Sequence, residues 1–159
     1  MLGRRYPGQN CSAARTLELV GERWSLLIVR DAMFAGITRF TDFQRSLDIA
    51  PNVLAKRLGE FVGAGIFELR PGSGGSRTEY VLTRKGRELQ PIIVALTEWG
   101  NRWADQDDNP ITFEHEGCGG QVALRMECSC CDGQPSPVEV KRGPVGPGEP
   151  TSQQKARPG

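Results

Sequence analysis

Two pairs of metal-ligating residues lie near the C-terminal end of this 159-residue chain. His115 and Cys118 form the first pair, and Cys128 and Cys131 form the second, with two residues between the partners of each pair. Structural zinc takes four nitrogen or sulfur ligands, and this spacing lets one turn supply two of them. The sequence therefore predicts a structural zinc site. The alternative is a cluster of redox-active or adventitious thiols.

The segment between the two pairs, residues 119–127, is expected to form a minimal hairpin, and Cys130 is a substitute ligand. A further cysteine, Cys11, precedes the first predicted helix, for which Ser12 is the predicted N-cap. A thiol at a helix N-terminus is held more readily as the reactive thiolate, which makes Cys11 a candidate redox sensor. The alternative is a small buried residue that packs the first helix.

The elements that would position these groups are clearest in residues 39–82. A helix beginning at Pro51 has an apolar face, and the period of two in residues 67–70 and 80–82 predicts two strands around a flexible glycine-rich tip. Two helices followed by a basic hairpin are the layout of a winged helix-turn-helix, a DNA-binding motif. The candidate DNA contacts are Arg39, Pro51, Asn52, Ala55, Lys56, Arg57 and Arg77.

Five of these seven residues have side chains that can form hydrogen bonds or ion pairs with DNA. Asn52 can pair with adenine, and Lys56 can donate to guanine or to phosphate. Arg57 and Arg39 are expected to meet phosphates, and Arg77 in the wing is expected to enter a minor groove or grip the backbone. The alternative for each cation is a solvated surface charge.

Charge is distributed unevenly along the chain. Residues 1–87 hold 14 Lys/Arg against 8 Asp/Glu, whereas residues 88–159 hold 6 against 11, although the net charge is only +1. The basic half of the chain contains the predicted DNA-binding helices and wing, and its positive charge would attract an anionic partner. The sequence contains neither a secretory signal nor an apolar run long enough to span a bilayer, so the expected location is the cytoplasm.

The last predicted helix, capped by Thr83, carries the longest apolar stripe. The stripe comprises Leu89, Ile92, Ile93, Leu96, Trp99 and Trp103. This stripe either covers the domain's own core or pairs with a second copy of the chain. A small DNA-binding domain needs two half-sites for affinity, which favours a homodimer. Pro91 is expected to kink this helix or to loosen it locally.

Several runs in residues 11–104 resemble one known family. They are Leu17-x-Leu-Val-Gly-Glu-Arg-Trp24, Arg39-Phe40-x-x-Phe43, Leu54-x-x-Arg57-Leu58, Gly65-Ile66, Tyr80-x-Leu-Thr-x-x-Gly86 and Leu96-x-x-Trp99-Gly100. The chain in this respect resembles the HxlR-type winged helix-turn-helix regulators. The resemblance implies a homodimeric bacterial transcription regulator that binds a pseudo-palindromic operator, often as a repressor, with its recognition helix starting near Ala50. Cys11 matches a cysteine with which several members sense oxidants or electrophiles.

One departure from this family concerns the start of the recognition helix. Ala50 and Pro51 stand where such proteins usually carry Ser or Thr, and alanine is a poor N-cap. Asp48, one turn earlier, is therefore expected to supply the missing acceptor.

The predicted fold class is α+β, mainly helical: a winged helix-turn-helix domain with a long C-terminal dimerisation helix, followed by a small Cys/His-rich tail. We expect a flexible arm over residues 1–10, the winged domain over 11–104, a zinc-ribbon-like segment over 111–133 and a disordered tail over 134–159.

The predicted function is that of a sequence-specific regulator of transcription that binds double-stranded DNA, as a homodimeric repressor responsive to an oxidant or small-molecule effector. The alternative is a protein-interaction module that uses the winged fold and the tail without DNA. An enzyme is not expected, because the chain has one histidine, no phosphate-binding loop and no paired carboxylates.

Overall fold

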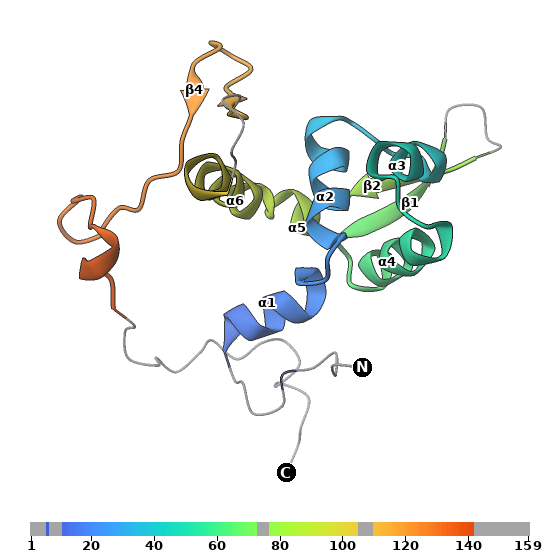
Figure 1. Ribbon diagram of the computed structural model, residues 1–159, viewed down its shortest axis with the longest axis horizontal. Helices are drawn as coiled ribbons and strands as arrows, with labels where there is room; N and C mark the ends of the chain where they lie inside the picture. The colour runs from blue at the N-terminus through green and yellow to red at the C-terminus, as the bar shows by residue number, and fades with distance from the viewer. Residues whose placement is uncertain (1–5, 7–10, 73–76, 105–109, 142–159) are drawn as a thin grey trace. The chain divides into compact units, whose positions relative to one another are not determined.

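The computed structural model describes Tyr6 and residues 11–72, 77–104 and 110–141. It divides into two units, residues 1–124 and 125–159, which we describe separately. The arm at residues 1–5 and 7–10, the wing tip at 73–76 and the tail at 142–159 lie outside the described residues. The elements of the first unit are α1 (Ser12–Val20), α2 (Ser25–Phe34), α3 (Phe40–Leu47), α4 (Pro51–Gly63), β1 (Phe67–Pro71), β2 (Thr78–Leu82), α5 (Arg84–Arg87), α6 (Gln90–Trp103), β3 (Phe113–Glu114) and β4 (Gln121–Val122) (Figure 1).

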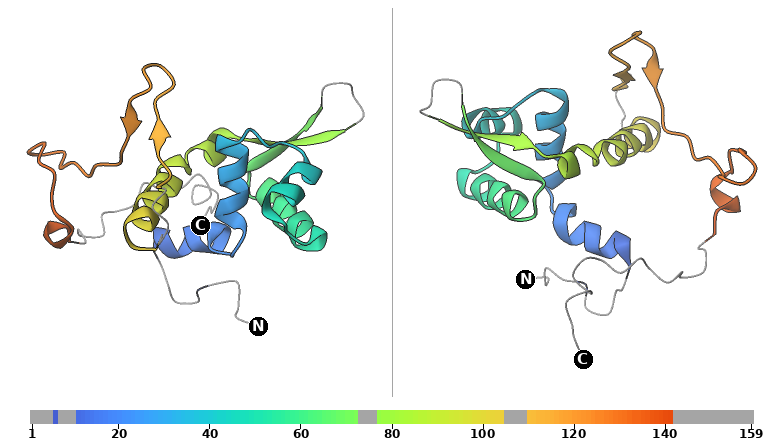
Figure 2. Two further views of the ribbon diagram at one scale, coloured as in Figure 1. Left: turned by 45° about the horizontal axis from the view of Figure 1, so that its top comes forward. Right: turned by 180° about the vertical axis from the view of Figure 1, so that it is seen from behind.

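Helices α3 and α4 and the hairpin β1–β2 form a winged helix-turn-helix. The two strands are antiparallel, in register from Phe67 opposite Leu82 to Pro71 opposite Thr78. The N–H of Tyr80 in β2 donates to the carbonyl of Thr38 at 2.8 Å, so the segment before α3 is joined to the wing. Figure 2 shows α3 and α4 beside this hairpin and α6 on the other side of α2. The predicted fold class is confirmed for this part of the chain.

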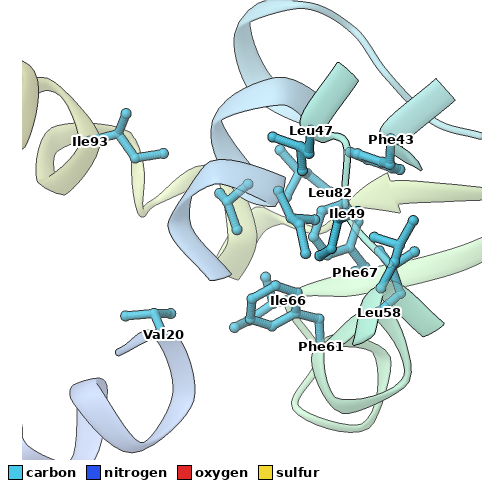
Figure 3. Packing of buried hydrophobic residues seen from close by; sticks show 13 residues of the cluster. Val20, Phe43, Leu47, Ile49, Leu58, Phe61, Ile66, Phe67, Leu82 and Ile93 are labelled. Atoms are coloured by element: carbon cyan, nitrogen blue, oxygen red, sulfur yellow. The ribbon is translucent and has the colours of Figure 1, made fainter. Parts of the chain in front are cut away.

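One hydrophobic core holds these elements together (Figure 3). Its buried members are Val20, Ile28, Val29, Phe43, Leu47, Ile49, Leu54, Leu58, Phe61, Ile66, Phe67, Leu82 and Ile93. Every element from α1 to α4, together with the hairpin and α6, contributes at least one side chain. Removal of this apolar surface from water is what stabilises the arrangement of the two helices and the wing.

Pro91 has a different effect from the expected kink. The predicted single helix is two: Thr83 caps the short α5, accepting from the N–H of Gly86 at 3.2 Å, and α6 begins afresh at Gln90 with Pro91 in its first turn. Because the first turn of a helix leaves its N–H groups without intrahelical partners, proline is tolerated there. The predicted local disturbance near Pro91 is therefore a break between two helices at residues 88–89, and not a kink within one.

The expected hairpin between the cysteine pairs also differs. The strands that pair are β3 and β4, with Phe113 opposite Val122, so the hairpin closes around the His115–Cys118 turn rather than forming after it. It is fastened to α6: Asn101 Nδ2 donates to the carbonyl of Ile111 at 2.7 Å, and the N–H of Ile111 donates to Asn101 Oδ1 at 3.2 Å. This hairpin is therefore part of the first unit.

The described part of the second unit, residues 125–141, has little regular structure. A tight turn spans Cys128–Gly133, where the N–H of Cys128 donates to the carbonyl of Gly133 at 2.9 Å. A 3₁₀ turn follows at Pro137–Glu139, with Ser136 and Glu139 forming a capping box. The hydrogen bonds from Ser136 hold the pKa of the Glu139 carboxyl below its ordinary value.

Candidate nucleic-acid interface

Helix α4 has one buried side and one exposed side. Leu54 and Leu58 are fully buried, and Phe61 is almost so, against the core. The exposed positions of the helix include four that the sequence selected: Pro51, Asn52, Ala55 and Lys56. This is the arrangement that a helix needs if it is to enter a major groove while its other side remains packed.

The start of α4 is built differently from the expectation. Its N-cap is Ala50, without a side-chain hydrogen bond, and Asp48 instead ends α3 in the left-handed conformation with φ of 47°. That conformation is several-fold enriched in Asp and Asn. Asn52 Oδ1 accepts from the N–H of Val53 at 2.9 Å, so within the first turn the acceptor is Asn52 and not Asp48. Asn52 would have to release this bond to pair bidentately with adenine.

Arg57 is placed apart from the exposed side of α4. Its side chain is 12% exposed, and its guanidinium contacts Glu22 at 2.8 Å and Glu60 at 2.7 Å. Glu22 lies in the turn before α2, so the ion pair joins that turn to α4. The phosphate contact predicted for Arg57 remains untested, but this geometry gives the guanidinium two carboxylate partners inside the protein.

The remaining predicted cations lie on the supporting segment and the wing. Arg39, the N-cap of α3, is 43% exposed and lies 3.6 Å from Glu79 in β2. Arg77 is exposed at the start of the returning strand, beside the wing tip. Arg45 on α3 exposes 81% of its side chain and was not selected by the sequence analysis, although a basic residue in the last turn of the supporting helix was a usable signal.

The His115–Cys118 turn brings its two side chains together. His115 Nδ1 lies 3.3 Å from Cys118 Sγ, and the carbonyl of His115 accepts from the N–H groups of Cys118 and Gly119 at 3.1 and 2.8 Å. Gly119 has φ of 68°, a conformation that glycine adopts without strain. Within this turn the two predicted ligands are neighbours.

The second predicted pair lies in the turn of the second unit. The N–H groups of Cys130 and Cys131, together with the Cys131 side chain, lower the pKa of the Cys128 thiol from its ordinary value. Among the residues that the structure describes, no three His, Cys, Asp or Glu side chains are gathered as metal ligands. The four-ligand site therefore remains a prediction.

Cys11 is exposed, and it is the N-cap of α1 in place of the expected Ser12. Its Sγ accepts from the N–H of Ala14 at 3.4 Å. In the single chain this cysteine is therefore not buried in the packing of the first helix. A sulfur in this position receives the N–H groups at the positive end of the helix dipole.

These features define a DNA-binding winged helix-turn-helix protein: an exposed side of α4, a wing that is hydrogen-bonded to the segment before α3, and basic side chains around both. Residues 19–108 match the family described as HxlR-like helix-turn-helix. The chain belongs to this family, and it is a DNA-binding regulator of transcription and not an enzyme.

Relatives extend this similarity over nearly the whole chain. An HTH-type transcriptional regulator of Mycobacterium tuberculosis (strain ATCC 25618 / H37Rv) is 40% identical over 149 residues, covering 92% of each chain. The crystal structure of the transcription factor PA1607 is 36% identical, with a TM-score of 0.77 over 86% of this chain and 96% of that chain. The redox regulator HypR in its reduced form is 30% identical, with a TM-score of 0.54, and covers 60% of this chain and 95% of its own. In the described part of this chain, no helix has the length and apolarity needed to cross a membrane.

The neighbours Lys56 and Arg57 should respond differently to truncation. Lys56→Ala should lower affinity for a duplex obtained by binding-site selection with the wild-type protein about tenfold, within the range for a lost base contact. It should leave the free energy of unfolding nearly unchanged. Arg57→Ala should lower the free energy of unfolding by about 1 kcal/mol, because the ion pairs from its largely buried guanidinium to the partly exposed Glu22 and Glu60 are lost. Fluorescence anisotropy with labelled duplex and urea denaturation measure the two quantities. Equal effects of both substitutions on stability would contradict this assignment.

Proposed function

We propose that the chain acts as a homodimer that binds two operator half-sites and represses transcription. The observation that carries the dimer is that most of the apolar stripe on α6 stays exposed in the single chain, although Ile93 is buried in the core. Trp99 is 61% exposed and Trp103 70% exposed, with Leu96 at 51% beside them. Large aromatic side chains of this kind are typical anchors of protein interfaces.

Helix α1 adds to the same argument. Leu17 and Leu19 expose half or nearly half of their side chains, so α1 also has apolar surface that its own core leaves uncovered. A second copy supplies a partner that is complementary by symmetry, because a two-fold interface uses one patch twice. Two copies would present two α4 helices, as a palindromic operator requires.

The reading of DNA is proposed for the residues that α4 and the wing present. Lys56 and Asn52 are the candidates for base contacts, with Pro51 and Ala55 beside them on the exposed side. Arg39 and Arg77 are the candidates for backbone contacts. Contacts to phosphate make affinity fall steeply with salt, whereas contacts to base edges set the preferred sequence.

A charge placed in the α6 stripe tests the dimer. Trp99→Glu should convert the protein to a monomer in sedimentation velocity and reduce operator affinity by at least about tenfold, because each half-site would bind alone. Circular dichroism should show that the monomer keeps its fold, since Trp99 is mostly outside the core of the single chain. Arg102→Glu, on the same helix but outside the stripe, is the control and should remain dimeric. A Trp99→Glu protein that stays dimeric would refute this interface.

We further propose that Cys11 makes the regulator responsive to oxidants. The support is its exposed position at the start of α1 and the similarity to HypR, which is described as a redox regulator. In the proposed step, the Cys11 thiolate attacks one oxygen of hydrogen peroxide. The S–O bond forms as the O–O bond breaks, and the departing hydroxide takes a proton to become water. The sulfur is oxidised to a sulfenic acid, and the peroxide is reduced.

Peroxide should change the operator affinity of the wild-type protein by at least about threefold, a response well above assay error and near 0.7 kcal/mol. Cys11→Ser should abolish the response, and Cys130→Ser should retain it. Dithiothreitol should restore the original affinity, because a sulfenic acid is reducible. A Cys11→Ser protein that responds like the wild type would exclude this cysteine as the sensor.

Zinc is proposed for the Cys/His segment, with His115, Cys118, Cys128 and Cys131 as the ligands named by the sequence. The support is local to each turn: the close approach of His115 Nδ1 to Cys118 Sγ in one, and the N–H groups that lower the pKa of Cys128 in the other. Zinc binding needs deprotonated sulfur, which a lowered thiol pKa favours.

The purified protein should contain one zinc ion per chain by atomic emission, and a chelator should remove it. Cys131→Ser should lose the ion, because a lost thiolate leaves the tetrahedron incomplete. Cys130→Ser is the matched control in the same turn and should retain it. A wild-type protein free of metal after expression in zinc-supplemented medium would contradict the proposal.

A further inference from the structure

A cavity of about 360 Å³ lies between α2, α6 and strand β3. Its volume falls within the range of small-molecule sites in proteins. The apolar lining includes Leu26, Leu27, Phe34, Leu96, Ile111 and Phe113, of which Leu96 also belongs to the stripe on α6. All of these residues belong to the first unit, and none is among the candidate DNA contacts.

One wall of this cavity comes from the β3–β4 hairpin. Phe113 packs on Phe34 of α2 with ring centroids 4.6 Å apart, and the two hydrogen bonds between Asn101 and Ile111 hold the strand to α6. The N–H of Leu124 donates to Glu98 Oε1 at 3.0 Å, which fastens the other end of the hairpin to the same helix. The hairpin lies beyond the family match at residues 19–108, so it is an addition to the regulator fold.

The lining leaves apolar surface uncovered. Ile111 is 61% exposed and Phe34 is 41% exposed, although both face the cavity from fastened elements. Covering such surface is favourable by about 25 cal/mol per Å². The hairpin segment at Ile111 and the end of α2 at Phe34 are both held in place and still have uncovered apolar side chains, which provide binding surface for an apolar occupant.

The charged groups of the lining pair with each other. Arg30 and Asp31 lie 2.7 Å apart, and Asp31 also accepts from Ser46 Oγ at 2.6 Å. The hydroxyl of Thr97 donates to the carbonyl of Ile93 at 2.9 Å. In the described part of the chain these are the charged or hydroxyl side chains that line the cavity, and the Arg30–Asp31 pair brings no net charge to it, so an ionised ligand group would meet no uncompensated opposite charge there.

We infer that this cavity binds an uncharged, apolar molecule with an aromatic ring system, one per chain. The aromatic pair Phe34–Phe113 favours a flat ring, and the mutual pairing of Arg30 with Asp31 selects against ionised groups. The site lies on α2, which is hydrogen-bonded to α3 through Asp31 and Ser46. The inference does not depend on the proposed function, because its test contains no DNA.

The probe is N-phenyl-1-naphthylamine, which is uncharged and fluoresces in apolar surroundings. Titration of the full chain should show saturable binding with one probe per chain. The matched probe is 8-anilinonaphthalene-1-sulfonate, which has the same rings and adds one sulfonate. It should bind at least about tenfold more weakly, because its charge meets no unpaired cation.

Substitutions at one position test the location. Thr97→Phe fills the cavity and should weaken N-phenyl-1-naphthylamine at least about tenfold, whereas the near-isosteric Thr97→Val should stay within about twofold of the wild type. Circular dichroism checks the fold of both proteins. If Thr97→Phe does not fold, Asn101→Ala, which loosens the hairpin wall, should weaken the probe several-fold.

Three results would overturn the inference. The first is unchanged binding in folded Thr97→Phe, or in Asn101→Ala where that variant replaces it, and the second is sulfonate binding equal to that of the neutral probe. The third is binding that occurs only in monomeric Trp99→Glu, which would show that a second copy of the chain covers the cavity.

Discussion

The packing of Phe67 is the constraint on which the rest of the domain depends. This residue opens the first wing strand and is 1% exposed. Its ring meets Phe43 of α3 edge to face, with centroids 6.3 Å apart, and Phe61 of α4 at 5.8 Å. The side chain of Phe67 therefore links both α3 and α4 to the base of the wing. Because a packed interior tolerates little change in volume, the direction of α4 relative to the wing is set by these three rings.

The basic residues of the helix-turn-helix differ in their surroundings. Lys56 is exposed, while the next residue is turned toward carboxylates and helps to hold α4 in place. A partly buried guanidinium with two carboxylate partners contributes more to fixing a helix than a solvated surface pair does. Exposed positive charge lies instead on α4, on α3 and just before the returning wing strand.

The β3–β4 hairpin supplies one wall of the apolar cavity and a candidate metal-binding turn. Relatives such as HypR cover 60% of this chain, whereas the PA1607 structure covers 86%. In this chain the added hairpin is fastened to α6 by Asn101 and Glu98, and it contains the His115–Cys118 turn. The helix proposed for dimerisation, the apolar cavity and one candidate metal-binding turn are thus connected by a few hydrogen bonds.

The sequence by itself determined the helices, the wing and the family, because the periods of 3.6 and two residues and the motifs in residues 11–104 are local properties of the chain. It also placed Leu54 and Leu58 inside and Lys56 outside. Tertiary structure decided what local patterns do not contain: that Arg57 pairs with Glu22 from a distant turn, and that Phe113 returns to Phe34. Each of these depends on the partner that the folded core brings alongside, and spacing along the chain does not specify that partner.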